Sequence, residues 1–394
     1  MITKEQKIES WHEARRFWKY PQLAEPVFCE LDGIAAMDMH SKTIMVNEDT
    51  LEQKIGEDLL STIYNHEIGH YKLCPYSLSK FLVLMGKADS VLQNISQAKF
   101  VENLFADLLI NYHVFTRGDK GIVETYNRLN QGKKETWWDV YLSVWGGMIG
   151  QDYGTSNVDG VGNMVTSLQN CVYRSKQWPE IIVDFAQFIK PYLKNKDKDC
   201  LIDEHGAESF NCNSKELGEA RKQLTLREYN RVVAGTGLGT SKKANIDYYN
   251  MLASNYSLSL PEHKSFSGNV ILESSIDCEP EKAMEADFEY SLARSPKLHP
   301  YALSTWKYSQ GNGTREEIVR DDLLIVLDSS GSMPDPNEEI SIPLVSAHIA
   351  KQSAFKANRM VGVVNFATKK CVVNFSHNSQ EIDGAMSTYF GGGT

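Results

Sequence analysis

The sequence feature that most restricts what this chain can form is a His-Glu-x-x-His motif at His66, Glu67 and His70. Apolar residues recur at helical spacing through residues 59–73, and Pro75 follows shortly after them. This pattern predicts a helix that places both histidines on one inward face, about one turn apart. Two imidazoles in that arrangement can bind one zinc ion, and the neighbouring carboxylate can reach a water molecule in the ion's open position. The alternative is a pair of core histidines beside a solvated glutamate.

A second long helix is expected over residues 89–115, and it carries two acidic side chains beside its apolar stripe. Glu102 and Asp107 are separated by five positions, which places them about 140° apart around the helix axis. A catalytic zinc site takes three protein ligands and keeps one position open. One of the two acids is therefore expected to join His66 and His70 as the third zinc ligand. The other is expected to orient a histidine or to be a surface charge.

The composition excludes several classes of function. The chain has 394 residues and a formal net charge of −10 without a basic block, which argues against a nucleic-acid partner. No apolar run is long enough to cross a bilayer, and the N-terminus has no secretion signal, so no membrane association is expected. The seven cysteines are an odd number without a C-x-x-C pair, which favours a reducing, cytoplasmic compartment.

Short strands are predicted over residues 27–29 and 42–46, ahead of the motif helix. An exposed edge of such a sheet could bind an extended peptide as an added strand, which is what a peptidase needs. The alternative is that these strands only pack against the helix, and the sequence leaves both interpretations open.

The character of the chain changes at Asp322. Residues 323–327 form an apolar run that is typical of a strand buried on both faces. A helical pattern follows over residues 340–360, and further strands are expected over residues 361–366 and 371–375. Alternating strands and helices imply a parallel, doubly wound α/β sheet, in which ligands bind at the carboxyl ends of the strands.

Three side chains with oxygen atoms follow the first of these strands, namely Asp328, Ser330 and Ser332. One carboxylate and two hydroxyls suit magnesium, because Mg²⁺ prefers oxygen ligands and keeps several water molecules. The alternative is a serine-rich turn whose side chains cap the following helix.

This D-x-S-x-S spacing after a buried strand closely resembles the metal-ion-dependent adhesion site (MIDAS) of von Willebrand factor A-type domains. Residues 391–394 resemble the second loop of that site, which implies Thr394 as a further Mg²⁺ ligand. The resemblance covers residues 320–394, roughly half of such a domain. The aspartate of the family's third loop has no counterpart here, so the resemblance implies a domain that is truncated at its C-terminal end.

The N-terminal part resembles zincin metallopeptidases, and the whole chain resembles prokaryotic proteins that join a metallopeptidase domain to a von Willebrand A-type domain. In that group an Ala-Asp followed by Ile-Asn lies downstream of the motif. Here these pairs are Ala106-Asp107 and Ile110-Asn111, which implies Asp107 as the third zinc ligand. The gluzincin pattern, a glutamate ligand with an aspartate four residues later, implies Glu102 instead, although Asp107 is five residues on. The resemblance also implies an AAA+ ATPase of the MoxR type as partner.

These observations predict an α+β chain with three regions. A mainly helical, zincin-like metallopeptidase domain is expected in residues 1–195, and a mostly helical extension in residues 196–319. The first part of an α/β, doubly wound A-type domain is expected in residues 320–394.

The expected activity is that of a zinc-dependent endopeptidase, a hydrolase of peptide bonds in which Glu67 is the general base. The Mg²⁺-binding domain would recruit the protein substrate or a partner. Tyr64, Tyr71 or His113 could stabilise the oxyanion. The alternative function is a non-proteolytic adaptor or assembly factor that holds a structural zinc and works with the AAA+ ATPase. A structural zinc normally has four protein ligands, which distinguishes the two possibilities.

Overall fold

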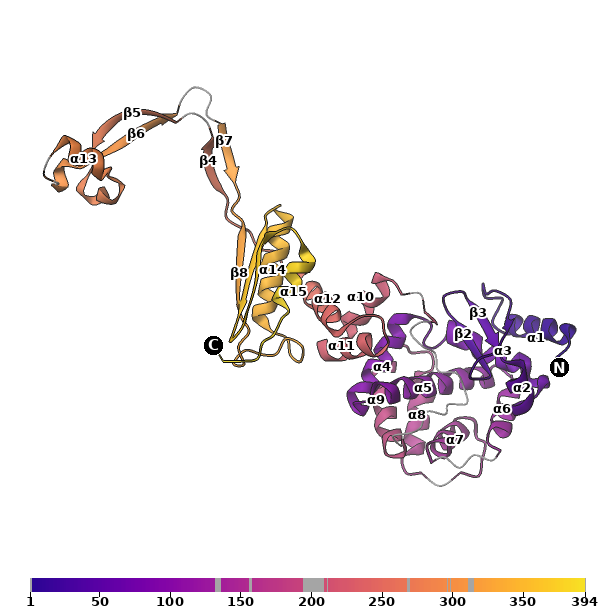
Figure 1. Cartoon of the computed structure of the whole chain (residues 1–394). Coiled ribbons are helices and arrows are strands. Elements are labelled where there is room, and N and C mark those ends of the chain that lie inside the picture. Colours follow the sequence, from indigo (N-terminus) through magenta and orange to yellow (C-terminus); the bar gives the residue numbers. More distant parts are fainter. Residues whose placement is uncertain are drawn as a thin grey trace. The chain divides into compact units, whose positions relative to one another are not determined.

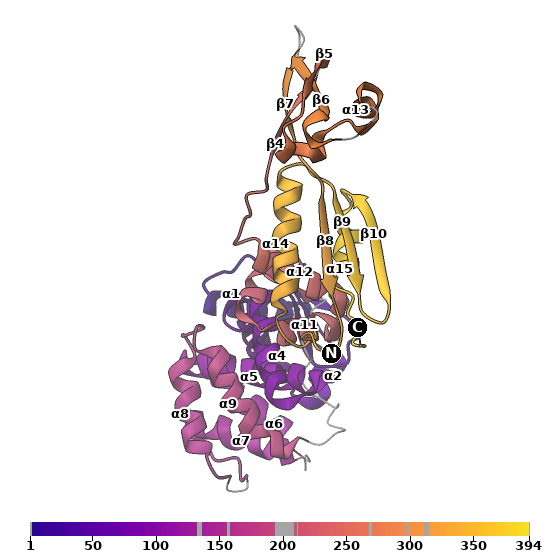
Figure 2. The same cartoon turned by 90° about the vertical axis from the view of Figure 1, so that its left-hand side faces the viewer.

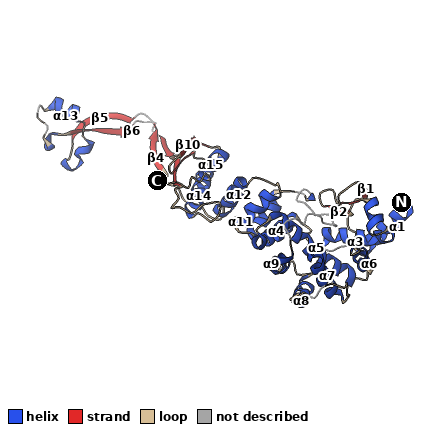
Figure 3. Ribbon diagram, turned by 60° about the horizontal axis from the view of Figure 1, so that its bottom comes forward, coloured by secondary structure: helices blue, strands red, loops and turns tan. Residues whose placement is uncertain are grey.

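The structure is a computed structural model, which describes residues 2–131, 136–155, 158–193, 209–210, 212–267, 270–295, 297, 299–310 and 315–393. The chain divides into two compact units. The first comprises Met1–Leu252 with Gly331–Val345 and Gly393, and the second comprises Ala253–Ser330 with Ser346–Gly392. Helices dominate the first unit, whereas most of the strands belong to the second (Figure 3).

A small three-stranded sheet precedes the motif helix in the first unit (Figure 1). Its strands are β1 (Val27–Phe28), β2 (Ala35–Asp38) and β3 (Thr43–Val46). They lie in the order β1-β3-β2, and β3 pairs in parallel with β1 and in antiparallel with β2. Strands β1 and β3 lie where the sequence predicts strands. Strand β2 occupies a stretch for which the sequence predicts only a turn, because a strand of four residues shows its alternating pattern only twice.

The helices of the first unit are α1 (Lys4–Phe17), α2 (Glu48–Lys54), α3 (Leu60–Lys72), α4 (Leu78–Leu92), α5 (Ile95–Thr116), α6 (Gly121–Leu129), α7 (Thr136–Ile149), α8 (Val161–Cys171), α9 (Trp178–Ile189), α10 (Ser214–Gln223), α11 (Leu226–Gly235) and α12 (Ser241–Ala253). The central helix is α5, which packs against α3, α4, α6, α7, α8, α9 and α11 (Figure 1). Large aromatic side chains, including Trp138, Trp145 and Trp178, fill the core around it. In the described part of the chain, no helix combines the length and the apolar character needed to cross a membrane.

The helix predicted over residues 89–115 is divided between α4 and α5. Gln93 ends α4 because it adopts a left-handed backbone conformation with a φ of 54°. Asn94 then begins α5, since its side chain accepts hydrogen bonds from two backbone N–H groups in the first turn of that helix. The break therefore lies before the stretch that carries the two candidate acids.

Close packing holds α3 against its neighbours. Gly69 lies directly against α5, where an added methyl group would be 2.3 Å from Cγ2 of Ile110. Just before α6, Asp119 accepts hydrogen bonds from Thr62 Oγ1 at 3.0 Å and from Asn65 Nδ2 at 2.8 Å. Because Gly69 has no side chain, α3 and α5 approach closely enough for the motif to face the acids of α5.

The described part of residues 196–319 contains helices and also four strands that the sequence does not predict. Helices α10 and α11 pack against α4, so they belong to the first unit. After α12 the chain forms two antiparallel pairs of strands and a short helix: β4 (His263–Ser267) with β7 (Arg315–Val319), β5 (Val270–Asp277) with β6 (Ser304–Gln310), and α13 (Phe288–Arg294). The division between the compact units falls at Leu252 instead of near residue 195.

Residues 323–386 form a strand-helix-strand arrangement followed by a third strand and a helix (Figure 2): β8 (Leu323–Asp328), α14 (Ile342–Lys356), β9 (Val361–Phe366), β10 (Lys370–Ser376) and α15 (Ser379–Met386). Strands β8 and β9 pair in parallel, as the predicted doubly wound pattern requires. Strand β10 is antiparallel to β9 and so departs from that pattern. Only residues 367–369 separate β9 from β10, whereas a parallel return needs a crossover of about a dozen residues or more.

The two faces of β8 have different environments. Ile325 and Leu327 are buried, whereas Leu324 and Val326 on the other face are 52% and 59% exposed. The prediction that this apolar run is buried on both faces is therefore wrong for the described structure. Asp328 ends the strand on the exposed face.

Candidate metal centre

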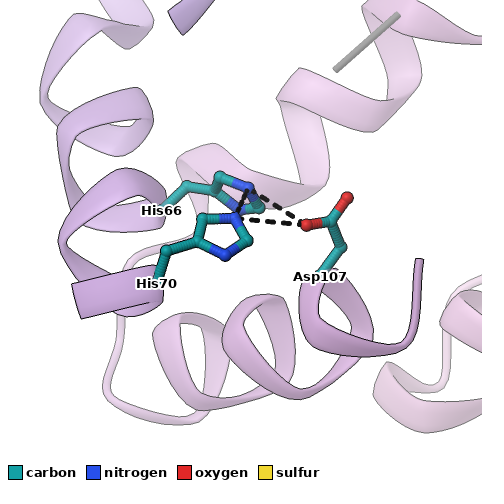
Figure 4. A group of neighbouring side chains, drawn as sticks. All are labelled: His66, His70 and Asp107. Atoms are coloured by element: carbon teal, nitrogen blue, oxygen red, sulfur yellow. Dashed lines mark hydrogen bonds and ion pairs between the residues drawn. The ribbon is translucent and has the colours of Figure 1, made fainter. Parts of the chain in front are cut away.

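Three buried side chains of α3 and α5 converge in the first unit (Figure 4). The Nε2 atoms of His66 and His70 are 3.2 Å apart, and each lies 3.4 Å from Oδ1 of Asp107. Among the described residues, no other group of at least three His, Cys, Asp or Glu side chains converges in this way. The group could hold a metal ion, because each member directs one potential ligand atom toward the same point.

The size of this triangle fits the coordination sphere of a metal ion. A tetrahedral site with bonds of about 2.0–2.1 Å has ligand atoms about 3.3–3.4 Å apart along each edge. The three observed separations of 3.2, 3.4 and 3.4 Å agree with that edge length. Two imidazole nitrogens and one carboxylate oxygen are also a ligand set that proteins use for divalent metals. The residues present therefore fit a metal ion.

The electrostatics of the centre also favour a cation. Asp107 and His70 have no exposed surface, and His66 is only 5% exposed. Burial alone would raise the pKa of Asp107, but its contacts with His66 and His70 hold that pKa well below the usual range. Burial opposes protonation of His66, yet the Asp107 carboxylate outweighs it and raises the pKa of His66 to about 9. A buried carboxylate that stays ionised requires a positive charge beside it, either a proton on an imidazole or a metal ion.

Asn111 orients His66, and sequence reasoning did not assign it this role. The Nδ2 group of Asn111 donates to the hydroxyl of Tyr126 at 2.7 Å, so its Oδ1, 2.8 Å from Nδ1 of His66, accepts the proton of that nitrogen. The Tyr126 hydroxyl in turn lies 2.9 Å from that of Tyr141. This network leaves the lone pair of His66 Nε2 directed at the centre, as a metal ligand requires. The signal in the sequence is the four-residue spacing from Asp107 to Asn111, which places both on one face of α5.

Replacing Asn111 with Ala is expected to weaken metal binding by about 10–100-fold, because His66 loses the acceptor that fixes its tautomer and ring orientation. Asn111→Asp is expected to keep most of the affinity, since a carboxylate can still accept from His66 Nδ1. Asn230→Ala is the matched control, as Asn230 is also a buried asparagine but lies on α11. Competition with a chromophoric chelator measures the affinity. Equal affinity in Asn111→Ala and Asn230→Ala would contradict the assigned role.

The structure brings Asp107, and not Glu102, to the two imidazoles. Glu102 is buried on a different side of α5 and is not a member of the converging group. The angular separation of the two acids on one helix explains this, because only one of them can face α3. Burial and the nearby charge of Asp107 raise the pKa of Glu102 well above its usual range. Glu102 is therefore a buried carboxyl group near the centre and not one of its ligands.

Glu67 lies in the wall of a small pocket next to the centre. The pocket has a volume of about 30 Å³, and both Glu67 and His66 line it. Strand β2 contributes Ala35, and α6 contributes Thr125 and Tyr126. Solvent or substrate in this pocket would therefore meet Glu67 and His66 directly. Strand β2 is at the edge of its sheet, but Ala35 is only 3% exposed, so at this position the strand packs against the centre.

The three residues that the sequence suggested for oxyanion stabilisation do not line the pocket. The ring of Tyr64 packs edge-on against Trp11, with 5.5 Å between ring centroids. His113 lies with Nδ1 2.9 Å from the hydroxyl of Tyr173, and burial lowers its pKa to about 4, with a further contribution from a neighbouring arginine. Tyr71 is partly exposed on the surface of α3.

The predicted magnesium ligands lie at the end of β8 and beyond. The backbone N–H of Ser330 donates to Oδ1 of Asp328 at 2.8 Å, a contact that is also typical of a simple turn. Ser332 falls in the first compact unit, and Thr394 lies outside the described residues. The backbone N–H of Gly391 donates to the carbonyl of Ser329 at 3.2 Å, so the loop before Thr394 does lie beside the end of β8. A magnesium site here stays a prediction from the sequence.

Comparisons of the chain with family models, with curated proteins and with solved structures find no match. The function is therefore inferred from the side chains of the centre and from the pocket beside them. The buried group of His66, His70 and Asp107 carries most of the chemical information.

Proposed function

We propose that this chain is a zinc-dependent endopeptidase in which His66, His70 and Asp107 hold the metal and Glu67 is the general base. The observation that carries the proposal is the triangle of ligand atoms, with sides of 3.2, 3.4 and 3.4 Å, next to a buried glutamate that lines a pocket. Three protein ligands and an adjacent acid are the parts that a hydrolytic zinc site needs.

The size of the triangle favours zinc over a hard octahedral ion. An octahedral magnesium site with bonds of about 2.0–2.1 Å would have neighbouring ligand atoms only about 2.9 Å apart. The observed separations are longer and agree with a tetrahedron. Two imidazoles also suit zinc better than magnesium, which is usually bound by oxygen atoms. Among the described residues no fourth His, Cys, Asp or Glu joins the group, which favours a hydrolytic site over a structural one.

Each side chain of the centre has a role in this proposal. Bound zinc would polarise the scissile carbonyl and lower the pKa of a nearby water molecule. Glu67 takes the proton from the attacking water and gives it to the leaving amine. Asn111 holds His66 in the orientation that a ligand needs, and the carboxylate of Asp107 offsets part of the positive charge. The pocket beside Glu67 gives a side chain of the substrate a place next to His66 and Glu67.

The C-terminal region, residues 320–394, has a binding role in this proposal. The parallel pair of β8 and β9 places Asp328 at the carboxyl end of β8, where sheets of this kind bind ligands. Asp328 and Ser330, with Ser332 and Thr394, would hold Mg²⁺ and recruit a protein substrate or a MoxR-type AAA+ ATPase. A cytoplasmic location follows from the same reading of the sequence. These assignments rest on the sequence pattern and on the position of Asp328.

Metal removal tests the proposal. The purified chain is expected to contain zinc and to cleave a pool of quenched fluorescent peptides. Dialysis against a zinc chelator is expected to abolish cleavage, and added zinc is expected to restore it. Metal content by mass spectrometry and the rate of fluorescence increase are the two measurements. A chain that binds zinc tightly but cleaves nothing would instead support the non-proteolytic adaptor, and a chain without affinity for zinc would exclude both functions.

A further inference from the structure

The pocket beside Glu67 is almost entirely aliphatic. Branched or small apolar side chains form most of its wall, namely Ile34, Ala35, Ile55, Ile63, Ile122 and Leu129. Of the charged residues in the described part of the chain, only Glu67 lines it. A negatively charged group that enters this pocket would lose its hydration and would lie beside the carboxylate of Glu67. An alkyl group would instead be favoured, because it buries apolar surface against apolar walls.

The volume of the pocket restricts what can enter it. Its roughly 30 Å³ compares with about 10–15 Å³ for a cavity that holds one water molecule, and with about 150 Å³ for an engineered cavity that binds benzene. An aromatic ring is therefore too large, whereas a methyl or isopropyl group can be accommodated. A peptide backbone also does not fit, so only a side chain can occupy the pocket.

The walls of the pocket are held in place at both ends of α6. Asp119, just before the helix, accepts hydrogen bonds from Thr62 and Asn65 of α3. At the other end, Arg128 forms a bidentate ion pair with Asp58, with N–O distances of 2.7 and 2.9 Å, and also donates to the backbone carbonyl of Ile55. Ile55 and four side chains of α6 line the pocket, so these contacts fix its width. A pocket with fixed walls can exclude groups by size.

We infer that this pocket selects the substrate: it accepts a small aliphatic side chain, the size of that of Ala or Val, next to the scissile peptide bond. Aromatic side chains are excluded by volume, and acidic side chains by desolvation next to Glu67. This inference rests on the proposed function, because it places the reacting carbonyl at the metal centre. Its specificity-determining residues are Leu129 and Ile122, which come from the part of the wall formed by α6.

A set of hydroxamates tests the inference without depending on turnover. The probes are the N-acetyl hydroxamates of Ala, Val, Phe and Asp, which share one zinc-binding group and differ only in the side chain. Calorimetric titration of the zinc-loaded full chain is expected to show at least about ten-fold tighter binding of the Ala and Val probes than of the Phe and Asp probes. Tight binding of all four probes with equal affinity would overturn the inference and leave the metal centre intact. If no probe binds, the inference and the proposed function fall together.

Enlarging the pocket supplies the second part of the test. Leu129→Ala and, separately, Ile122→Ala are expected to raise the affinity of the Phe probe about ten-fold or more, while the Asp probe stays weak. Leu168→Ala is the matched control, because Leu168 is equally buried but lies on α8 away from the pocket. If either enlarged variant folds, as judged by circular dichroism, and its Phe affinity does not change, the inference is overturned. If neither folds, the ranking of the four probes on the unaltered chain decides.

Discussion

Glu67→Gln is expected to retain the metal and to lower peptide hydrolysis by about 10²–10⁴-fold. The amide has nearly the shape of the carboxylate, so the packing around this buried residue is kept, but it cannot accept a proton from water. Glu67 is not a member of the converging group, so its change leaves the ligand atoms in place. The expected loss therefore lies in kcat, with little change in metal affinity.

The measurements are kcat/KM on a quenched peptide that the unaltered chain cleaves, and zinc content by mass spectrometry. Glu102→Gln is the matched control, because Glu102 is also a buried glutamate near the centre but does not line the pocket. The control is expected to keep both zinc and activity. Turnover in Glu67→Gln equal to that of the control would exclude the general-base role of Glu67.

The direction of the two histidines could be predicted from the sequence, but the choice of the acid could not. The spacing of His66 and His70 within one helix is enough to place them on one face. Glu102 and Asp107 both flank the apolar stripe of α5, so the choice between them depends on the rotation of α5 about its own axis. That rotation is set by contacts between residues far apart in sequence, such as Gly69 against Ile110.

Some neighbours of the metal centre could also be predicted from the sequence, whereas others could not. The role of Asn111 could have been predicted, since it follows Asp107 by four residues and therefore shares its direction on α5. The hydroxyls of Tyr126 and Tyr141 could not, because they come from α6 and α7 and reach Asn111 only through the tertiary fold. The pocket likewise combines side chains from β2, α3 and α6 with others from the intervening loops, and no local pattern indicates it.

Strand pairing was the least predictable part of the fold. Strands β4 and β7 have the sequences HKSFS and REEIV, which lack a regular alternation of apolar and polar residues, so the sequence gives little sign of them. Strand β10 was expected from its apolar residues, but its direction depends on the length of the connection from β9. The apolar run of β8 correctly predicted a strand. The prediction that both of its faces are buried was wrong, because Leu324 and Val326 are exposed on one face.

Asp107→Ala is expected to remove metal binding, with a larger loss of affinity than the roughly 10–100-fold expected for Asn111→Ala. The side chain of Asp107 supplies the only carboxylate oxygen in the converging group, so its removal leaves two imidazoles alone. The pKa of His66 should also fall, because the carboxylate that raises it to about 9 is gone. Peptide hydrolysis should be lost together with the metal.

Thermal unfolding with and without zinc measures this loss independently of catalysis. A ligand present at one hundred times its Kd stabilises the folded protein by about 2.7 kcal/mol, so zinc should raise the unfolding temperature of the unaltered chain. The same addition should leave Asp107→Ala unchanged and should still stabilise Glu102→Gln. If zinc stabilised Asp107→Ala but no longer stabilised Glu102→Gln, the third ligand would be Glu102 instead of Asp107. Since Glu102 lies outside the converging group, the structure predicts the opposite pattern.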